Sequence, residues 1–435
     1  MSVSSPPPPA PAAAAAEAPR LRKRRLPQIQ ELGLVVVVLL LGFVLWFASP
    51  AVAVKVHAGA TIVNGVKTMQ PAYTVSENGF LRVANLVPSV FTVMSWMAVM
   101  AIGQTIVIIS GGIDISVGSI MGLSGFVTAL VLQGSSTIDD SGNVLWHGYD
   151  WLNSTPLWMH GFLMAPVMQA VIGAGVACGV GLICGLINGG LVVGLRMHPF
   201  IVTLATLSIF RWGAEKIGFL LGNNMTLPWG DRSLAPGFTD HFIALEYHRM
   251  RFGGRATENL QFVPIAIMLV CLALGWIYLR YTVWGRETYA LGGNEEAARY
   301  SGIRLAWVKM RVYALSGLSA GIAGMLSAGY YRSASADLGT GYELMVIAAA
   351  VVGGASLTGG RGTALGAFLG TLVLELVADG IAVLGKVNVG LFSFRVVTQD
   401  EQLILGLAIL VAVAVDNLSM YISRRRSALS GAAAH

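Results

Sequence analysis

The chain has 435 residues, of which 55% are hydrophobic and 11% are charged, and its mean hydropathy is +0.69. Soluble globular domains carry about 25% charged residues, so this composition excludes that class and indicates a polytopic protein embedded in membrane lipid. The formal net charge of +6 indicates no nucleic-acid partner, because Lys and Arg in membrane proteins mainly mark cytoplasmic loops. The three cysteines lie inside apolar runs, at spacings that predict packing residues and neither a metal site nor a disulfide.

The N-terminal segment is predicted to be a disordered, basic cytoplasmic tail over residues 1–30. It consists mainly of Ser, Pro and Ala, followed by a cluster of Arg and Lys over residues 20–25, and such a composition cannot bury a core. The apolar run 32–54 comes next. A cleaved signal peptide is the alternative, but this run exceeds the ~7–15 apolar residues typical of a signal peptide. We therefore expect a retained first span.

Further apolar runs predict an all-α membrane domain over residues 31–421 with about ten transmembrane helices, and a short tail, 422–435. Basic residues concentrate in the tails and in the segment 281–309, which predicts that both termini are cytoplasmic (N-in/C-in). The outer loops are then 55–82, 134–161, 222–260 and 386–401. The later spans are expected at 83–109, up to 132, within 164–193, at 200–221 and 262–279, up to 330, on either side of 353–361, and at 403–415.

The predicted fourth span is rich in glycine, with residues at 175, 179, 181, 185, 189, 190 and 194. Small residues four positions apart let two helix backbones approach closely. We therefore expect glycine-rich helix packing along this span.

The stretch from Ser110 to Gly125 places paired glycines, a carboxylate and hydroxyls between two apolar runs. Polar, irregular backbone is stable at membrane depth only where protein buries it or water hydrates it. Asp114 either caps a helix that begins at Ile115, with Ser116 and Ser119 in its first turn, or contacts a transported molecule. The two interpretations are compatible, because carriers often build polar sites from capped half-helices.

The pattern Gly-Gly-x-x-x-Ser-x-Gly at 111–118 recurs as Gly-Gly-x-x-x-Thr-x-Gly at 353–360. It marks either an internal repeat, as in many transporters, or a chance match between two glycine-rich turns. Glu343, Glu375 and Asp379 lie in or near the spans around the second copy, where each either lines a path or sits at the membrane interface. Arg211 and Glu215 are four residues apart and are expected to pair on one helix face.

Two enzymatic interpretations find little support. Gly-x-Ser-Gly at 122–125 is similar to an intramembrane serine protease motif, but no second element indicates a catalytic dyad. The chain contains no Gly-x-x-x-x-Gly-Lys-[Ser/Thr] sequence, so it has no P-loop for ATP. We expect a protein that is not an enzyme and holds no cofactor or metal.

The basic segment 281–309 contains the signals of a short capped helix. Asn294 suits the N-cap, Glu295 and Glu296 suit the first turn, Arg299 suits the last, and Gly302 can end the helix. Such a helix in a cytoplasmic loop is either a connector or a docking element for a soluble partner.

Five ordered motifs resemble the permease subunit of ribose/xylose-type sugar ABC importers. They are Gly-Gly-Ile-Asp-Ile-Ser-Val-Gly-Ser at 111–119, Gly-Leu-Ile-Asn-Gly at 185–189, Pro-Phe-Ile-Val-Thr-Leu at 199–204, Gly-Gly-Asn-Glu-Glu-Ala-Ala-Arg-Tyr-Ser-Gly-Ile at 292–303, and Val-Val-Gly-Gly-Ala-Ser-Leu-Thr-Gly-Gly-Arg-Gly at 351–362. The resemblance implies a multi-pass permease of the bacterial inner membrane. It also implies three partners: a second permease copy, cytoplasmic ABC ATPase subunits that bind ATP, and a periplasmic sugar-binding protein.

By that resemblance, the segment that couples the chain to the ATPase contains Gly292, Gly293, Asn294, Glu295, Glu296, Ala297, Ala298, Arg299 and Gly302. The candidates for a translocation path or gate are Asp114, Ser116, Ser119, Asn188, Thr203 and Glu343. The implied function is import of a monosaccharide, such as a pentose, a hexose or a related polyol, by alternating access driven by the separate ATPase. The alternatives are an ion-coupled secondary carrier and, more remotely, the intramembrane protease.

Overall fold

The computed structural model describes residues 29–49, 51–56, 59–63, 66–70, 73–82, 85–138, 144–149, 163, 165–220, 226–227, 232–240, 245–251, 254–260, 262–384, 386–389, 392–395 and 406. Nearly all of both predicted tails and, apart from Gly406, the predicted span at 403–415 lie outside these residues.

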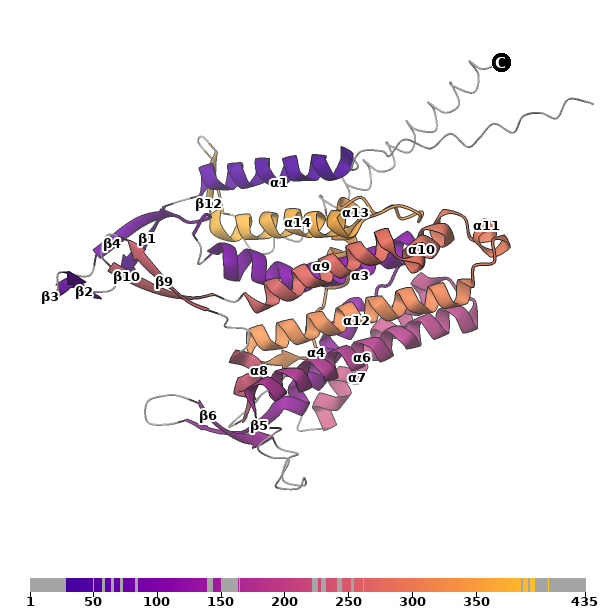
Figure 1. Cartoon of the computed structure of the whole chain (residues 1–435), viewed down its shortest axis with the longest axis horizontal. Coiled ribbons are helices and arrows are strands. Elements are labelled where there is room, and N and C mark those ends of the chain that lie inside the picture. Colours follow the sequence, from indigo (N-terminus) through magenta and orange to yellow (C-terminus); the bar gives the residue numbers. More distant parts are fainter. Residues whose placement is uncertain are drawn as a thin grey trace, which may run out of the picture.

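The described chain is a helix bundle, as the composition predicts. Figure 1 shows the long helices side by side, with α1 next to α14, α12 in the middle, and α6 and α7 beyond it. The helices are α1 (Ile29–Ala48), η1 (Leu86–Thr92), α3 (Val93–Ile109), α4 (Val117–Leu132), α6 (Pro166–Leu195), α7 (Pro199–Leu220), α8 (Pro236–Asp240), α9 (Val263–Tyr281), α10 (Val283–Gly293), α11 (Glu295–Tyr300), α12 (Leu305–Tyr331), α13 (Tyr342–Val352) and α14 (Ala364–Leu384).

Six of these helical stretches are long and apolar enough to cross a membrane: residues 31–48, 86–109, 166–195, 263–281, 305–331 and 364–383. The helix α7 has 22 residues but carries Arg211, Glu215 and Lys216. The helices α4 and α13 have only 16 and 11 residues. At 1.5 Å per residue they extend about 24 and 17 Å, less than the ~30 Å of a bilayer core. The multi-pass helical class is confirmed, whereas ten spans and an N-in/C-in orientation stay predictions.

Short antiparallel strands, which the sequence did not predict, lie mainly in the predicted outer loops. β1 pairs with β4, β2 with β3, β7 with β11, β9 with β10, β12 with β13, and β5 with both β6 and β8. Their bounds are β1 (Ala51–Val56), β2 (Gly59–Val63), β3 (Val66–Gln70), β4 (Tyr73–Asn78), β5 (Gln133–Ile138), β6 (Val144–Tyr149), β7 (Thr226–Leu227), β8 (Arg232–Leu234), β9 (Leu245–Arg251), β10 (Gly254–Leu260), β11 (Ala334–Ser335), β12 (Lys386–Val389) and β13 (Phe392–Arg395).

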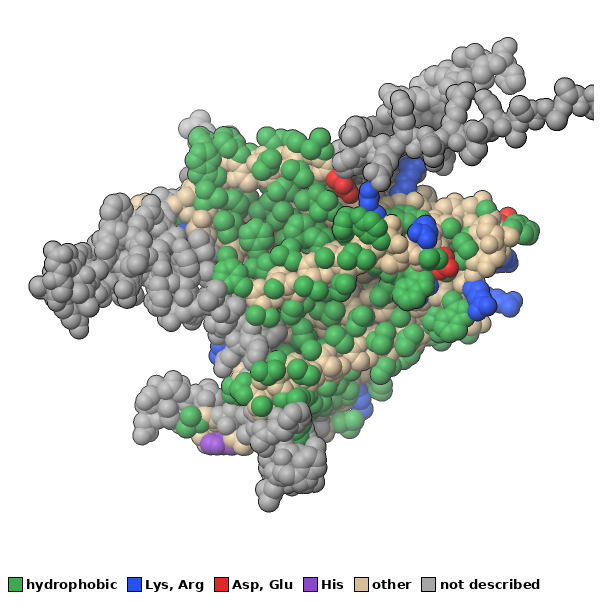
Figure 2. Space-filling view, in the orientation of Figure 1, with side chains coloured by type: hydrophobic (Ala, Val, Ile, Leu, Met, Phe, Trp, Pro, Cys, Tyr) green, Lys and Arg blue, Asp and Glu red, His purple; other side chains and the backbone are tan. Residues whose placement is uncertain are grey.

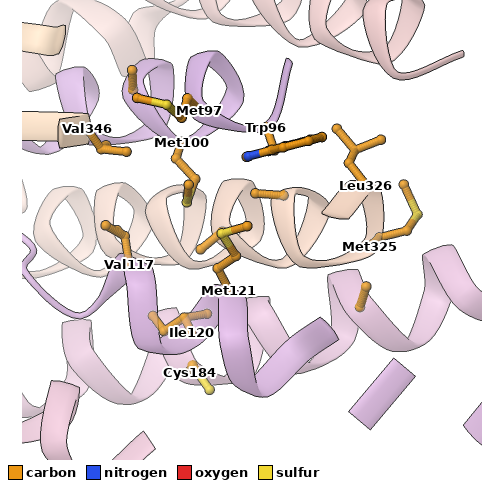
Figure 3. Close-up of a cluster of buried hydrophobic side chains, with 14 of the residues drawn as sticks. Trp96, Met97, Met100, Val117, Ile120, Met121, Cys184, Met325, Leu326 and Val346 are labelled. Atoms are coloured by element: carbon orange, nitrogen blue, oxygen red, sulfur yellow. The ribbon is translucent and has the colours of Figure 1, made fainter. Parts of the chain in front are cut away.

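The centre of the bundle is a set of large apolar side chains between α3, α4 and α12. Figure 3 shows Trp96 and Met100 of α3, Met121 of α4, and Met325 and Leu326 of α12 around a common core. All five are at least nine-tenths buried. Because lipid is as apolar as these side chains, their close van der Waals packing is what holds the helices together.

The contact between α6 and α12 confirms the predicted glycine packing, but for one face only. A Cβ atom added to Gly181 would overlap the Gly317 carbonyl oxygen, and one added to Gly185 would overlap the Tyr313 carbonyl oxygen. By contrast, Gly175 and Gly179 have no heavy atom within 4 Å of the Cβ position. The glycines that matter for packing are therefore those spaced four apart on the α12 side.

Replacement of Gly181 by Ala should destabilise the folded protein, because the methyl group would push α6 away from α12. Overpacking of this kind costs about 1–3 kcal/mol. The matched control is Gly179→Ala on the same helix, whose methyl group meets no atom. Thermal unfolding of both variants in detergent compares them, and equal midpoints would contradict the close contact.

Candidate functional site

The carboxylate of Asp114 lies at the centre of a buried polar network between α3 and α4. Its Oδ1 accepts hydrogen bonds from the Ser116 backbone N–H at 3.0 Å and the Ser116 hydroxyl at 2.7 Å. Its Oδ2 accepts a hydrogen bond from the Ser316 hydroxyl of α12 at 2.9 Å. The side chain has no exposed surface, so these bonds offset the cost of removing a carboxylate from water.

The network extends to α6 and α3. Asn188 of α6 donates from Nδ2 to the Ser116 hydroxyl oxygen at 2.7 Å. The side-chain amide of Gln104 on α3 binds both backbone groups of Asp114. Its nitrogen donates to the Asp114 carbonyl oxygen and its oxygen accepts from the Asp114 N–H, both at 3.1 Å. Side chains from three helices therefore hold the turn at 110–116 in one conformation.

Asp114 stabilises the start of α4, but it is not the N-cap residue that the sequence predicts. The helix α4 begins at Val117 with Ser116 as its N-cap residue, two residues later than expected. Asp114 lies before the helix and binds the N–H of Ser116, two residues ahead, as in an Asx-turn. A carboxylate in this position also interacts favourably with the positive end of the α4 dipole.

Five of the six predicted path residues meet in or beside this network. Asp114, Ser116, Ser119, Asn188 and Thr203 have no exposed surface. Ser119 donates to the Ser116 carbonyl oxygen at 2.8 Å. The Thr203 hydroxyl of α7 donates to the Pro199 carbonyl oxygen at 3.1 Å and to that of Ile113 at 3.3 Å. They can touch a transported molecule only after neighbouring helices move, so their role as a path or gate stays a prediction.

The sixth residue, Glu343, lies where α4 and α13 begin. These are the two apolar helices too short to cross a bilayer, and they are called the half-length helices below. Glu343 is in the first turn of α13, and a Cβ atom on Gly118 at the start of α4 would overlap its carboxylate and the carbonyl oxygen of Gly339. Its buried Oε2 has no hydrogen-bond partner among the described residues. The N-termini of α4 and α13 therefore meet inside the bundle, beside one carboxylate.

The backbone that leads into α13 is not helical, and Arg211 of α7 supplies hydrogen bonds to two of its carbonyl oxygens. Its Nη1 donates to the carbonyl oxygens of Ala336 and Leu338, both at 2.8 Å. The predicted pair with Glu215 is wrong: within the described part of the chain, the two side chains form no ion pair, and Arg211 points to these carbonyls instead. The reason is that these two carbonyl oxygens belong to non-helical backbone and accept the hydrogen bonds of the guanidinium in place of Glu215.

The segment 281–309 contains the predicted capped helix. Asn294 Oδ1 accepts from the Ala297 N–H at 2.9 Å, and α11 runs from Glu295 to Tyr300. Gly302 adopts a φ of +81°, and hydrogen bonds from Ile303 N to Ala298 O and from Gly302 N to Arg299 O complete a Schellman motif. The helix boundaries and both caps are confirmed.

One ion pair joins α11 to α12 and a second lies within α11, while the outer surface of α11 is exposed. Glu295 lies 2.8 Å from Lys309 Nζ and 3.9 Å from Arg299 Nη2. Tyr300 is 89% exposed. Figure 2 shows Lys and Arg gathered around the end of the bundle that carries α10 and α11. This is the surface that a soluble partner could reach.

Sequence reasoning missed the partners that other helices supply to the turn. Ser316 and Gln104 lie in apolar spans that carry no motif signal, and Arg211 was assigned to the wrong partner. A polar residue within an otherwise apolar span was the only available signal, because such residues tend to hydrogen-bond across helices.

Replacement of Ser316 by Ala should destabilise the protein by about 1–3 kcal/mol, because Asp114 Oδ2 would lose its donor while buried. In a double-mutant cycle with Asp114→Asn, the two effects should be non-additive. Ser327→Ala is the control, since Ser327 is also buried on α12 but its hydroxyl has no partner among the described residues. Denaturation in detergent measures all four variants; additive effects would contradict the shared network.

Comparison with known proteins assigns this architecture to a family. Residues 86–418 match the family described as "Branched-chain amino acid transport system / permease component". The chain is 33% identical over 318 residues to the ribose import permease protein of Bacillus subtilis (strain 168), covering 73% of this chain and 80% of that protein. It is 31% identical over 339 residues to the galactose/methyl galactoside import permease protein of Escherichia coli (strain K12), covering 78% and 88%.

A third relative is the D-allose transport system permease protein of Escherichia coli (strain K12), which is 31% identical over 340 residues, covering 78% of this chain and 85% of that protein. No solved structure matches the chain. The matched region contains the Asp114 network, both half-length helices and α11, so it includes every candidate site described above. The chain therefore belongs to this permease family and is a membrane subunit of an ABC transport system, a transport component and not an enzyme.

Proposed function

We propose that this chain is the membrane-spanning permease subunit of an ABC importer that moves a monosaccharide into the cytoplasm. The observation that carries the proposal is the similarity to permeases named for ribose, galactose or methyl galactoside, and D-allose import, over most of both chains. The named substrates share a small, neutral, polyhydroxylated ring. A pentose, a hexose or a related polyol is therefore the substrate class.

The proposed mechanism is alternating access driven by a separate ATPase. Two permease copies enclose the path, a periplasmic sugar-binding protein delivers the substrate, and ATPase subunits dock at the α11 end. The exposed, capped α11 and the basic residues around it support this orientation, because positive charge favours the cytoplasmic side. The chain then lies in the bacterial inner membrane with that end inside the cell.

In this scheme, the six candidate path residues fall into two neighbouring groups. The Asp114 network holds the turn before α4, and Glu343 lies at the point where α4 and α13 begin. Broken helices whose N-termini meet at mid-membrane are a common way to place polar groups beside a substrate. Separation of these half-helices would expose hydroxyl and carboxylate groups that suit sugar hydroxyls.

The partner assignment is tested by affinity purification of the tagged chain from its native membrane in detergent. A Walker-type ATPase should co-purify, and its repeated absence would overturn the proposal. Sugar uptake should persist when an ionophore collapses ion gradients while ATP remains. Uptake that stops under that condition would instead favour an ion-coupled carrier.

Disruption of α11 should separate transport from folding. Ala297→Pro removes the N–H that binds Asn294 Oδ1 and restricts the preceding residue to non-helical conformations. Uptake should fall to background while the amount of protein in the membrane stays unchanged. Ala297→Ser retains the N–H and serves as the control. Normal uptake by the proline variant would count against α11 as a coupling element.

A further inference from the structure

Three chain segments meet through backbone atoms at the α11 end of the bundle. They are the end of α3 at Ile109, the last residues of α10 at Gly292, and the turn at 359–362 between α13 and α14. The Gly360 N–H donates to the Ile109 carbonyl oxygen at 2.8 Å. Ile109 lies just before the first copy of the repeated glycine pattern, Gly359 and Gly360 end the second copy, and α10 leads directly into α11.

Gly292 lies at the centre of this meeting point. A Cβ atom at this position would overlap the Ile109 carbonyl oxygen and lie 2.7 Å from the Gly360 nitrogen. From the other side, a Cβ atom on Gly359 would lie 2.6 Å from the Gly292 carbonyl oxygen and 3.1 Å from the Gly111 Cα. The next residue, Gly293, has open space around its Cβ position. The steric requirement is therefore specific to position 292.

A side-chain contact fastens the same part of α10 one turn earlier. Tyr289 donates from its hydroxyl to the Gly362 carbonyl oxygen at 2.7 Å. The α10 end is thus held to the 359–362 turn at two points. Only Asn294 separates α10 from α11, so α11 cannot shift far without moving the α10 end as well.

Each of the two contacted segments leads to a half-length helix. The chain continues from Ile109 through the Asp114 turn to α4, and α13 runs into the turn that contains Gly360. Backbone atoms in direct contact cannot slide past each other as flexible side chains can, because packed interiors transmit displacements. A movement at α11 would therefore reach both half-length helices together.

We propose that Gly292 is a positioning residue that ties α11 to the turns beside α4 and α13, so that movement of a docked ATPase changes both half-helices at once. The inference rests on the proposed function, since it names the route by which that ATPase would act. It assigns a positioning role in energy coupling to the backbone contacts of Gly292 and to the Tyr289 hydroxyl.

The test compares ATP hydrolysis with sugar uptake in proteoliposomes that contain the purified complex and its binding protein. Gly292→Ala should leave the ATPase bound and active but lower the sugar imported per ATP by about tenfold, the factor that corresponds to an overpacking cost of about 1.4 kcal/mol. The matched control is Gly194→Ala, also at a helix end, where the Cβ position is open. The Gly194→Ala variant should import as much sugar per ATP as the unchanged chain.

A second variant covers the case in which Gly292→Ala does not assemble. Tyr289→Phe adds no volume and removes only the hydrogen bond to Gly362, so it should lower the same ratio to a smaller extent. A purely structural role would lower ATP hydrolysis and uptake in proportion, or reduce protein amount, without changing the ratio. An unchanged ratio in Tyr289→Phe, and in Gly292→Ala where it assembles, overturns the inference. Failure of the proposed function is distinguishable, because the unchanged chain would then recruit no ATPase.

Discussion

Backbone that leaves the helical conformation inside a membrane must find hydrogen-bond partners within the protein, and this requirement shapes the centre of the permease. The chain runs through non-helical backbone twice beside the packed helices, before α4 and before α13. At the first break, Gln104 binds both backbone groups of Asp114, and Asp114 in turn binds the Ser116 N–H. At the second, Arg211 binds two carbonyl oxygens. Each break is stable because neighbouring helices supply donors and acceptors that lipid cannot.

The price of this arrangement is a carboxylate with no access to water. Asp114 receives three hydrogen bonds, two from Ser116 and one from Ser316, and it lies at the positive end of α4. Removal of the Ser316 hydroxyl would leave the buried Oδ2 unsatisfied, which costs more than the bond contributes when intact. The network therefore specifies one conformation of the turn, and a change of that conformation requires α6 or α12 to move.

Glycine has two distinct uses in the bundle. Along α6 and α12 it lets long helices approach so closely that carbonyl oxygens occupy the space of a side chain. At the α11 end it lets the ends of α3 and α10 and the turn at 359–362 touch through their backbones, and Gly359 and Gly360 also adopt positive φ angles of 85° and 72°. The first use stabilises the bundle. The second brings the end of α10, which leads into the exposed α11, into backbone contact with the segments that precede α4 and follow α13.

The sequence alone determined the features that depend on local chemistry or composition. The membrane class follows from hydropathy. The caps of α11 follow from Asn294 and Gly302, which lie close to each other in the chain. The close approach of α6 to α12 follows from glycines four positions apart. Only the tertiary structure decided where Asp114, Arg211 and Gly292 act. The partners of Asp114 and Arg211 lie as far as 202 and 127 residues away, and Gly292 meets Ile109 and Gly360 from two other segments. Local propensity contains no information about which distant backbone group will lie within 3 Å, because helix packing brings those groups together only when the whole bundle forms.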